Sequence, residues 1–222
     1  MSSYITSSVA KKYIMALTGI PLMLFIFGHM LGNLQIFLGA DAINNYAATL
    51  QGLGGFLWAI RITLFVLFIT HAILSSILYV ENKLARPVSY HKPATVVATL
   101  TSRTMIITGL IVVCFLVFHI FHYTVQSVDP SFKHLFDAQG RHDVYTMLIK
   151  GFSNSSITSI YLLGVVLLGA HVHHAAASAL QSLGLMNHKY AKYINFAGPL
   201  LGVIVAVGYA VVPLCVLFKV IK

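Results

Sequence analysis

The chain has 222 residues, of which 58% are hydrophobic and only 9% are charged, and its formal net charge is +9. This composition lies outside the range of soluble globular proteins and indicates an integral membrane protein. The basic residues are scattered at the ends of apolar segments and form no continuous stripe. The positive charge therefore does not indicate a nucleic-acid-binding protein.

Five segments are apolar enough to cross a bilayer: residues 14–38, 56–80, 105–125, 157–183 and 194–220. Each reaches the length of about 20 residues that a helix needs to span a hydrocarbon core of about 30 Å. Backbone groups in that core have no water to bond, so each segment is expected to be helical. The sequence predicts an all-α membrane protein with five transmembrane helices, forming one domain over residues 1–222 without an internal repeat.

Lysine and arginine gather before the first segment, between the second and third, and between the fourth and fifth. This bias predicts a cytoplasmic N-terminus and an external C-terminus. The most basic stretch, residues 81–103, contains two prolines and is expected to be a loop or a docking surface for an acidic partner. Two short interfacial helices are expected on the other side, within residues 41–55 and around residues 144–152.

Four apolar segments each carry a histidine at membrane depth: His29, His71, His119 and His171. An ionisable residue inside a transmembrane segment is a functional-site hypothesis by default. At 1.5 Å of rise per residue, His29 and His119 lie about 25 Å from the cytoplasmic end, and His71 and His171 about 15 to 20 Å. We interpret these depths as an outer pair, His29 with His119, and an inner pair, His71 with His171.

Two imidazoles on facing helices fill both axial positions of an iron porphyrin and leave no open site for oxygen or substrate, so each haem only passes electrons. A four-helix bundle is a natural host for such cofactors. We therefore expect two haems in a bundle of the first four helices, with the fifth helix as a lipid-facing support. A single buried histidine is more simply explained by a hydrogen bond to a backbone carbonyl. Four histidines on four helices, two at each of two depths, instead favour haem ligation.

Other histidines near these positions are secondary candidates. His174 lies nearly one turn after His171 and is the second choice of ligand there, whereas His173 faces away. His122 lies one turn after His119 and is a candidate haem or quinone contact near the outer surface.

Small and polar residues near the histidines are further candidates for haem or quinone contacts. Gly28 and Gly32 flank His29 and leave one helix face bare, where a flat macrocycle or a neighbouring helix can approach. Arg61, three residues after Trp58, either pairs with a haem carboxylate or extends to the interface from the helix end. The remaining polar candidates are Asn33, Gln35, Arg103 and Ser178.

Five sequence motifs follow one another through nearly the whole chain: AKKYIMALTGIPL, GHMLGNLQIFLG, SRTMIITGL, DVYTMLIKGFSN and HVHHAAASALQSLGL. In this order they resemble the type B cytochrome b subunit of succinate:quinone oxidoreductases, which comprise succinate dehydrogenases and fumarate reductases. That family commonly has H-x-x-H-G-x-x-S in the fourth helix. His171 and Ser178 keep this spacing, while Ala175 replaces the glycine.

The resemblance implies a five-helix subunit that holds two haem b groups, with ligands paired between the first and third helices and between the second and fourth. It also implies a bacterial cytoplasmic membrane, where the chain anchors an FAD flavoprotein subunit and an iron–sulfur subunit on the cytoplasmic side. The implied reaction is electron transfer between the iron–sulfur subunit and membrane quinone, with menaquinone favoured. The chain has no residues for dicarboxylate chemistry, which belongs to the partners.

Two other functions remain open at this point. A small transporter or channel would use the histidines as a proton path or metal site, with acidic or hydroxyl partners along one pore. Glycine and aliphatic residues instead surround His29 and His71 in the sequence. A quinol cytochrome b of another respiratory complex would hold the same haems without this set of motifs.

Overall fold

The structure is a computed structural model that describes residues 7–85 and 104–222. Five of its helical spans are long and apolar enough to cross a membrane: Ser8–Leu38, Gly55–Leu84, Met105–Thr124, Ser155–Ser182 and His188–Leu217. These spans overlap the five predicted segments and confirm an all-α, multi-pass membrane architecture. Within the described ranges the only strand-like pairing is an isolated bridge between Phe136 and His142.

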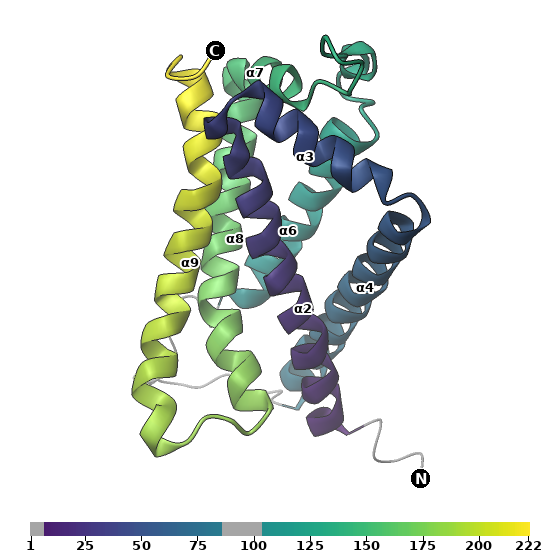
Figure 1. Ribbon diagram of the computed structural model, residues 1–222. Helices are drawn as coiled ribbons and strands as arrows, with labels where there is room; N and C mark the ends of the chain where they lie inside the picture. Colours follow the sequence, from purple (N-terminus) through teal and green to yellow (C-terminus); the bar gives the residue numbers. More distant parts are fainter. Residues whose placement is uncertain (1–6, 86–103) are drawn as a thin grey trace.

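The chain runs up and down through these spans, with short helices at one end (Figure 1). In chain order the helices are α2 (Ser8–Leu34), the 3-10 helix η1 (Gln35–Leu38), α3 (Ala40–Gly52), α4 (Gly55–Leu84), α6 (Met105–His119), the π-helix η2 (Ile120–Thr124), the 3-10 helix η3 (Pro130–His134), α7 (Val144–Ser153), α8 (Ser155–Ser182) and α9 (His188–Leu217).

The start of α2 and the end of α9 lie at opposite ends of the bundle (Figure 1). The short helices α3 and α7 lie at the end that carries the C-terminus, which we call the outer end, and the opposite end is the inner end. They confirm the two short helices predicted within residues 41–55 and around 144–152. Of the basic stretch 81–103, the first four residues continue α4, and residues 86–103 lie outside the described residues.

Side-chain caps fix where several of these helices begin. The Ser7 hydroxyl accepts a hydrogen bond from the third residue of α2, and the Asp143, Asn154 and Asn187 side chains do the same at α7, α8 and α9. Such caps satisfy backbone amides that have no partner inside the helix. The sequence therefore sets these helix starts locally, before any packing is considered.

Helices α8 and α9 form the most extensive contact in the bundle, and glycines allow it. A Cβ atom added at Gly169 or at Gly202 would lie 2.6 Å from the backbone oxygen of the other. Small residues at such crossings let two backbones approach closely, which is a common way for transmembrane helices to associate. Helix α2 packs on α4, α8 and α9, while α6 packs mainly on α8.

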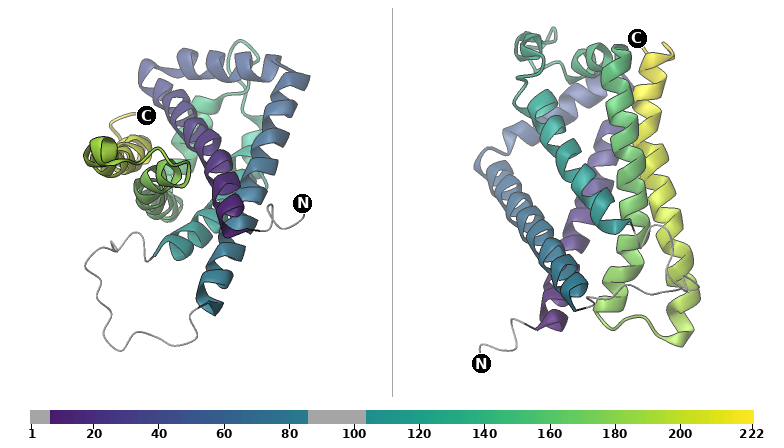
Figure 2. Two further views of the ribbon diagram at one scale, coloured as in Figure 1. Left: turned by 90° about the horizontal axis from the view of Figure 1, so that it is seen from below. Right: turned by 180° about the vertical axis from the view of Figure 1, so that it is seen from behind.

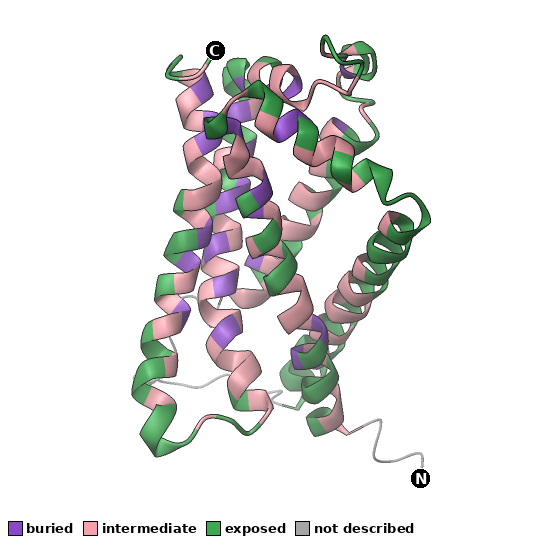
Figure 3. Cartoon of the chain, viewed as in Figure 1, coloured by how far each residue is buried: buried purple, intermediate pink, exposed green. Residues whose placement is uncertain are grey.

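The outward surface of the spans is exposed (Figure 3), and many of the side chains on it are large and apolar. Within α4 only Leu78 is buried, and large aliphatic and aromatic side chains on the other spans are exposed. Side chains of this kind face lipid in a protein of this class. Figure 2 shows α6 between α4 and α8, on the side of the bundle away from α2.

Polar contacts close the outer end over an apolar cluster. Asn44 of α3 is 1% exposed, and its amide donates to Asp143 over 3.0 Å while its oxygen accepts from the backbone of Tyr145 over 3.0 Å. Arg141 bridges Asp41 and Asp137, with 2.7 Å in each contact. The cluster beneath comprises Ile36, Ile43, Leu148, Phe152, Tyr161, Val212 and Val216.

Candidate functional site

The outer histidines face each other in the structure. The ring centres of His29 on α2 and His119 on α6 lie 5.8 Å apart, and the ring planes make an angle of 79°. Two imidazoles bound to one metal ion through bonds of about 2 Å have ring centres about 6 Å apart. The observed separation therefore fits two axial ligands of one iron.

Hydrogen bonds surround this outer pair. The Nδ1 atom of His119 lies 3.3 Å from the Tyr161 hydroxyl, which also lies 3.0 Å from Nδ1 of His122. The Asn33 amide donates to the backbone carbonyl of His29 over 2.8 Å and lies 3.3 Å from its Nε2 atom. If Nε2 of His29 binds a metal, it can no longer accept a hydrogen bond from Asn33. The Asn33 amide would then keep only its bond to the backbone carbonyl of His29.

The inner histidine of α4 is held by the first turns of α2. The Nδ1 atom of His71 lies 3.2 Å from the backbone oxygen of Met15 and 3.4 Å from the Thr18 hydroxyl oxygen. A carbonyl oxygen only accepts hydrogen bonds, so Nδ1 carries the proton and Nε2 of the neutral ring keeps its lone pair. Nε2 of His71 is therefore the nitrogen available to a metal.

The inner histidine of α8 is held in the same way by α6. Nδ1 of His171 lies 3.3 Å from the Thr108 hydroxyl, and the ring also makes a hydrogen bond with the backbone of Met105. The same argument leaves Nε2 of His171 unprotonated. His71 and His171 lie close enough to interact electrostatically.

The helices of each pair are held apart by their neighbours. The extensive contacts link α2 with α4, α6 with α8, and α2 with α8, whereas α2 with α6 and α4 with α8 are not among the closely packed pairs. Each imidazole pair therefore spans a separation between two helices. A flat macrocycle needs such a separation to lie between its two ligands.

The three neighbouring histidines of α8, His171, His173 and His174, do not all lie on the same side of that helix. A Cβ atom added at Gly202 of α9 would lie 2.7 Å from the Cβ atom of His173, so His173 lies against α9. His171 points toward α6, and His174 is half-buried.

The two candidate glycines differ in their surroundings. A Cβ atom added at Gly28 would meet nothing within 4 Å, so the face beside His29 is open. At Gly32 it would lie 2.7 Å from the Tyr46 ring of α3. Gly28 thus fits the approach of a macrocycle, whereas Gly32 serves helix packing.

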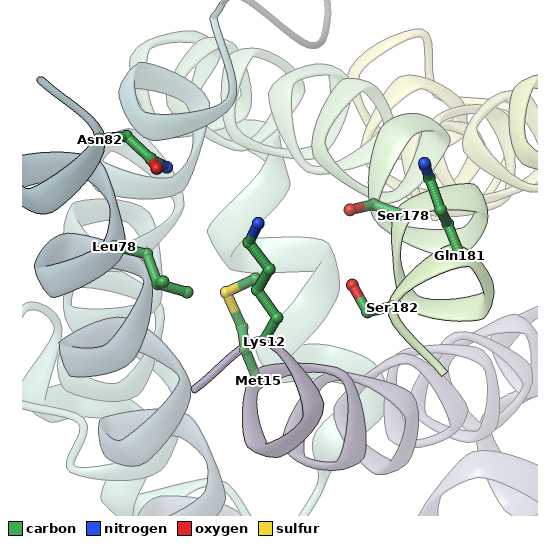
Figure 4. Close-up of a pocket in the computed structure, with 7 residues that line it drawn as sticks. All are labelled: Lys12, Met15, Leu78, Asn82, Ser178, Gln181 and Ser182. Atoms are coloured by element: carbon green, nitrogen blue, oxygen red, sulfur yellow. The ribbon is translucent and has the colours of Figure 1, made fainter. Parts of the chain in front are cut away.

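A polar cavity of about 380 Å³ opens at the inner end of the bundle (Figure 4). In Figure 4 the Lys12 ammonium group lies between α4, which contributes Asn82, and α8, which contributes Ser178 and Gln181. The full lining is Lys12, Met15, Leu78, Asn82, Ser178, Gln181 and Ser182. Ser178 was predicted as a contact from the sequence, whereas Lys12 counted there only among the basic residues before the first segment, because the other residues of the cavity come mainly from other helices.

A smaller cavity of about 190 Å³ lies at the outer end. His122 contributes to its wall although only 2% of its surface is exposed. The lining also contains Asp129, Lys150 and Asn154, so ionisable groups of both signs surround it. The Tyr161 hydroxyl connects His122 to His119 and therefore connects this cavity to the outer pair.

The remaining candidates lie elsewhere. The Arg61 guanidinium stacks over the Trp58 ring at 5.1 Å, and both side chains are exposed. Gln35 begins η1 and is half-buried. Arg103 lies outside the described residues.

The fifth span approaches the outer pair more closely than expected for a helix that only supports the bundle. The ring of Tyr209 on α9 lies 6.2 Å from that of His29, and its hydroxyl donates to the backbone oxygen of Ile26 over 2.7 Å. Helix α9 packs on both α8 and α2. The uniform apolarity of residues 194–220 concealed this role because the aromatic ring is itself largely apolar.

In the described ranges, no group of three or more His, Cys, Asp or Glu side chains is arranged to hold a metal ion by itself. An imidazole pair suits a metal whose equatorial nitrogens come from a porphyrin. Comparison with protein-family models, curated proteins and solved structures found no match for this chain.

Proposed function

We propose that this chain is a di-haem cytochrome b membrane anchor. It passes electrons between the iron–sulfur subunit of a succinate dehydrogenase or fumarate reductase and membrane quinone. The observation that carries the haem assignment is the set of two imidazole pairs on four spans, with ring centres 5.8 Å apart in the outer pair. The ordered sequence motifs carry the assignment of partners and quinone.

The protein's own contribution is to bind and orient. Each haem, when bound, supplies a one-electron carrier, and axial ligation on both faces limits it to electron transfer. His29 with His119 and His71 with His171 would hold the two groups. Hydrogen bonds from Nδ1 of His71 and His171 fix ring rotation and raise the basicity of Nε2.

The inner cavity suits the carboxylates of the inner haem. Lys11 pairs with Glu81, while the neighbouring Lys12 lines the cavity with its ammonium group. Asn82, Ser178 and Gln181 add hydrogen-bonding groups around it. A cation with polar neighbours near a helix end offsets the cost of placing carboxylates at the edge of the bilayer.

The outer cavity suits the ring of a quinone, with menaquinone favoured. A volume of about 190 Å³ is smaller than sites that bury a whole small molecule, so only a head group would enter. His122 has one ring nitrogen on Tyr161, and Asp129 and Lys150 lie in the same wall. Quinone reduction takes up protons, and these groups can deliver them from the outer surface.

The distribution of charge supports the orientation. The start of α2, whose sequence includes Lys11 and Lys12, and the end of α4, whose sequence includes Lys83, both lie at the inner end of the bundle (Figure 1). The bias supports a cytoplasmic position for this end. The proposed function puts it in the cytoplasm of a bacterium, where the FAD flavoprotein and iron–sulfur subunits would dock. A histidine-based transporter would use acidic or hydroxyl partners, and hydroxyls of Thr18, Thr108 and Tyr161 do lie beside His71, His171 and His119. It is less well supported because, in the described residues, no acidic side chain is found beside any of the four histidines.

The test is a pyridine haemochrome assay with a redox titration, performed on the chain purified with whatever subunits accompany it. Two haem b groups per chain that titrate in two steps are expected. Absence of haem would overturn the cytochrome assignment. If the chain purified from native membranes carries two haems but no flavin or iron–sulfur subunit, the quinol cytochrome b of another complex would be favoured.

A further inference from the structure

A short motif occurs twice in the chain, although the sequence analysis found no internal repeat. Its pattern is Met-x-x-Thr-Gly, and in both copies a histidine of the outer pair follows ten residues after the glycine. The copies lie 90 residues apart, one near the start of α2 and one at the start of α6: Met15, Thr18, Gly19 and His29, then Met105, Thr108, Gly109 and His119. Four matching positions alone would carry little weight, but both copies make the same contacts.

In the first copy the threonine links the helix backbone to the imidazole of another helix. The Thr18 hydroxyl contacts the backbone oxygen of Met15 at 3.0 Å, and its only hydrogen is used within α2. Its oxygen is then left to accept from Nδ1 of His71 at 3.4 Å. A Cβ atom added at Gly19 would lie 3.1 Å from the His71 ring, so the glycine permits this approach.

The second copy repeats each of these contacts on the other side of the bundle. The Thr108 hydroxyl donates to the backbone oxygen of Met105 over 3.0 Å and lies 3.3 Å from Nδ1 of His171. A Cβ atom added at Gly109 would lie 3.3 Å from the His171 ring. Both threonines are 6% exposed, so each hydroxyl is buried with its imidazole.

We propose that Thr18 and Thr108 are positioning residues for one and the same haem, the inner one, although they lie on the two helices that carry the outer ligands. Each holds the Nδ1 atom of one inner histidine and leaves Nε2 to the metal. This inference rests on the proposed function and extends it, because it assigns control of the inner haem to α2 and α6. The outer imidazoles instead contact Asn33 and Tyr161, so the device is specific to the inner pair.

The physical basis is the coupling between a metal ligand and its second hydrogen bond. An acceptor on Nδ1–H fixes the tautomer and the rotation of the ring and strengthens the ligand. Loss of the hydroxyl removes one of the two acceptors of Nδ1–H and leaves only the backbone oxygen of Met15 or Met105 to hold the ring. The ring is then held less firmly and is a weaker ligand, which changes both the electronic splitting of a low-spin ferric haem and its midpoint potential. Since both inner rings bind the same iron, either loss changes the same haem.

The experiment compares Thr18→Val and Thr108→Val in the assembled protein by electron paramagnetic resonance and by redox titration. Both substitutions keep the side-chain shape and remove the hydroxyl. We expect both to shift the g values and the midpoint potential of one haem, the same in each variant, and to leave the other haem unchanged. Thr63→Val, on the exposed face of α4, is the matched control and should change neither haem.

Further variants keep the test decisive. Thr18→Ser and Thr108→Ser retain the hydroxyl and should restore the wild-type signature, and Thr→Ala variants replace any Thr→Val protein that does not assemble. Three results would overturn the proposal and leave the cytochrome assignment intact. The two Thr→Val variants could affect two different haems, Thr18→Val could affect the haem that is lost in His29→Ala, or neither variant could affect any haem. A wild-type protein without haem would overturn the proposed function itself.

Discussion

His29 and His119 lie with their ring centres 5.8 Å apart and their planes at 79°, although 90 residues separate them along the chain. Helices α2 and α6 reach this arrangement by packing on α8 more than on each other. The two imidazoles thus face each other across a space that the backbone does not fill. This relationship leads to a set of variants that tests the pairing directly.

Alanine substitution of the four histidines should sort them into two pairs. His29→Ala and His119→Ala should each remove the same haem and halve the haem-to-protein ratio, and His71→Ala and His171→Ala should remove the other. An iron that loses one of two axial imidazoles is no longer held on both faces. The haemochrome ratio and the redox titration identify which haem is lost.

The control for that series is His173→Ala, because His173 packs against α9 and not toward the other imidazoles. It should keep both haems. If His29→Ala and His119→Ala each kept one haem, but the two remaining haems had different midpoint potentials, the pairing would be contradicted.

Enlargement of Gly28 should block the outer haem selectively. The face beside His29 is open at this glycine, and leucine is a good helix former, so Gly28→Leu fills the space without weakening α2. We expect about half of the total haem to be lost, with the inner haem retained. Ala59→Leu, at an exposed position of α4, should keep both haems, and full haem content in Gly28→Leu would show that this face meets lipid.

His122→Phe should impair quinone chemistry without removing haem. The phenyl ring keeps the stacking on Phe118, whose ring centre lies 5.5 Å away, but cannot carry a proton. General acid–base groups typically contribute at least about 100-fold, so quinone turnover should fall by about that factor. Steady-state turnover and haem reduction by stopped-flow spectroscopy separate the two steps. The exposed His134→Phe variant is the control, and equal turnover in both variants would exclude His122 from proton delivery.

Asn44→Ala should loosen the outer end of the bundle. The buried amide satisfies Asp143 and the backbone of Tyr145, and its removal leaves buried polar groups without that partner. Such a loss costs about 1 to 3 kcal/mol. Thermal unfolding in detergent should show this destabilisation, whereas Asn45→Ala, at the exposed neighbouring position, should match the wild type. Equal melting of both variants would show that the outer contacts carry no stability.

The same outer contacts should weaken in acid. Desolvation alone would raise the pKa of the Asp137 carboxyl, but hydrogen bonds from the Arg141 side chain and from the backbone amides of Arg141 and Gln139 lower it below its ordinary value. For Asp143 the Thr146 and Asn44 hydrogen bonds likewise outweigh desolvation and lower the pKa.

A carboxylate with a lowered folded-state pKa stabilises the fold above its unfolded pKa of about 3.9, and this contribution is lost as the pH falls through the folded value. Hydrogen exchange of residues 129–143, corrected for intrinsic rates, should therefore be constant from about pH 8 to pH 5 and accelerate below about pH 4. In Asp137→Asn the acid-dependent part should shrink. Acceleration already at neutral pH would contradict the assignment to these carboxylates.

Several features could be predicted from sequence because they depend on local properties. Apolar length and the absence of water for backbone groups define the five spans, and helical periodicity within residues 126–156 predicts α7. The depth of each histidine follows from counting along its own helix. The repeated Met-x-x-Thr-Gly motif and its histidine were also present in the sequence, but four matching positions at a spacing of 90 residues are too few to recognise without their shared contacts.

By itself, the sequence determined how many helices are long and apolar enough to cross the membrane and which part of the chain forms each one, although the first and fifth begin at Ser8 and His188 and not at residues 14 and 194. It also predicted the order in depth of the histidines. Only the tertiary structure decided that His29 faces His119, that Thr18 and Thr108 hold the inner imidazoles, and that Lys12 and Tyr209 approach the site. The division has a physical reason. Backbone hydrogen bonds within one segment set the position of a residue along a helix axis, whereas the rotation of that helix about its axis depends on packing against all of its neighbours.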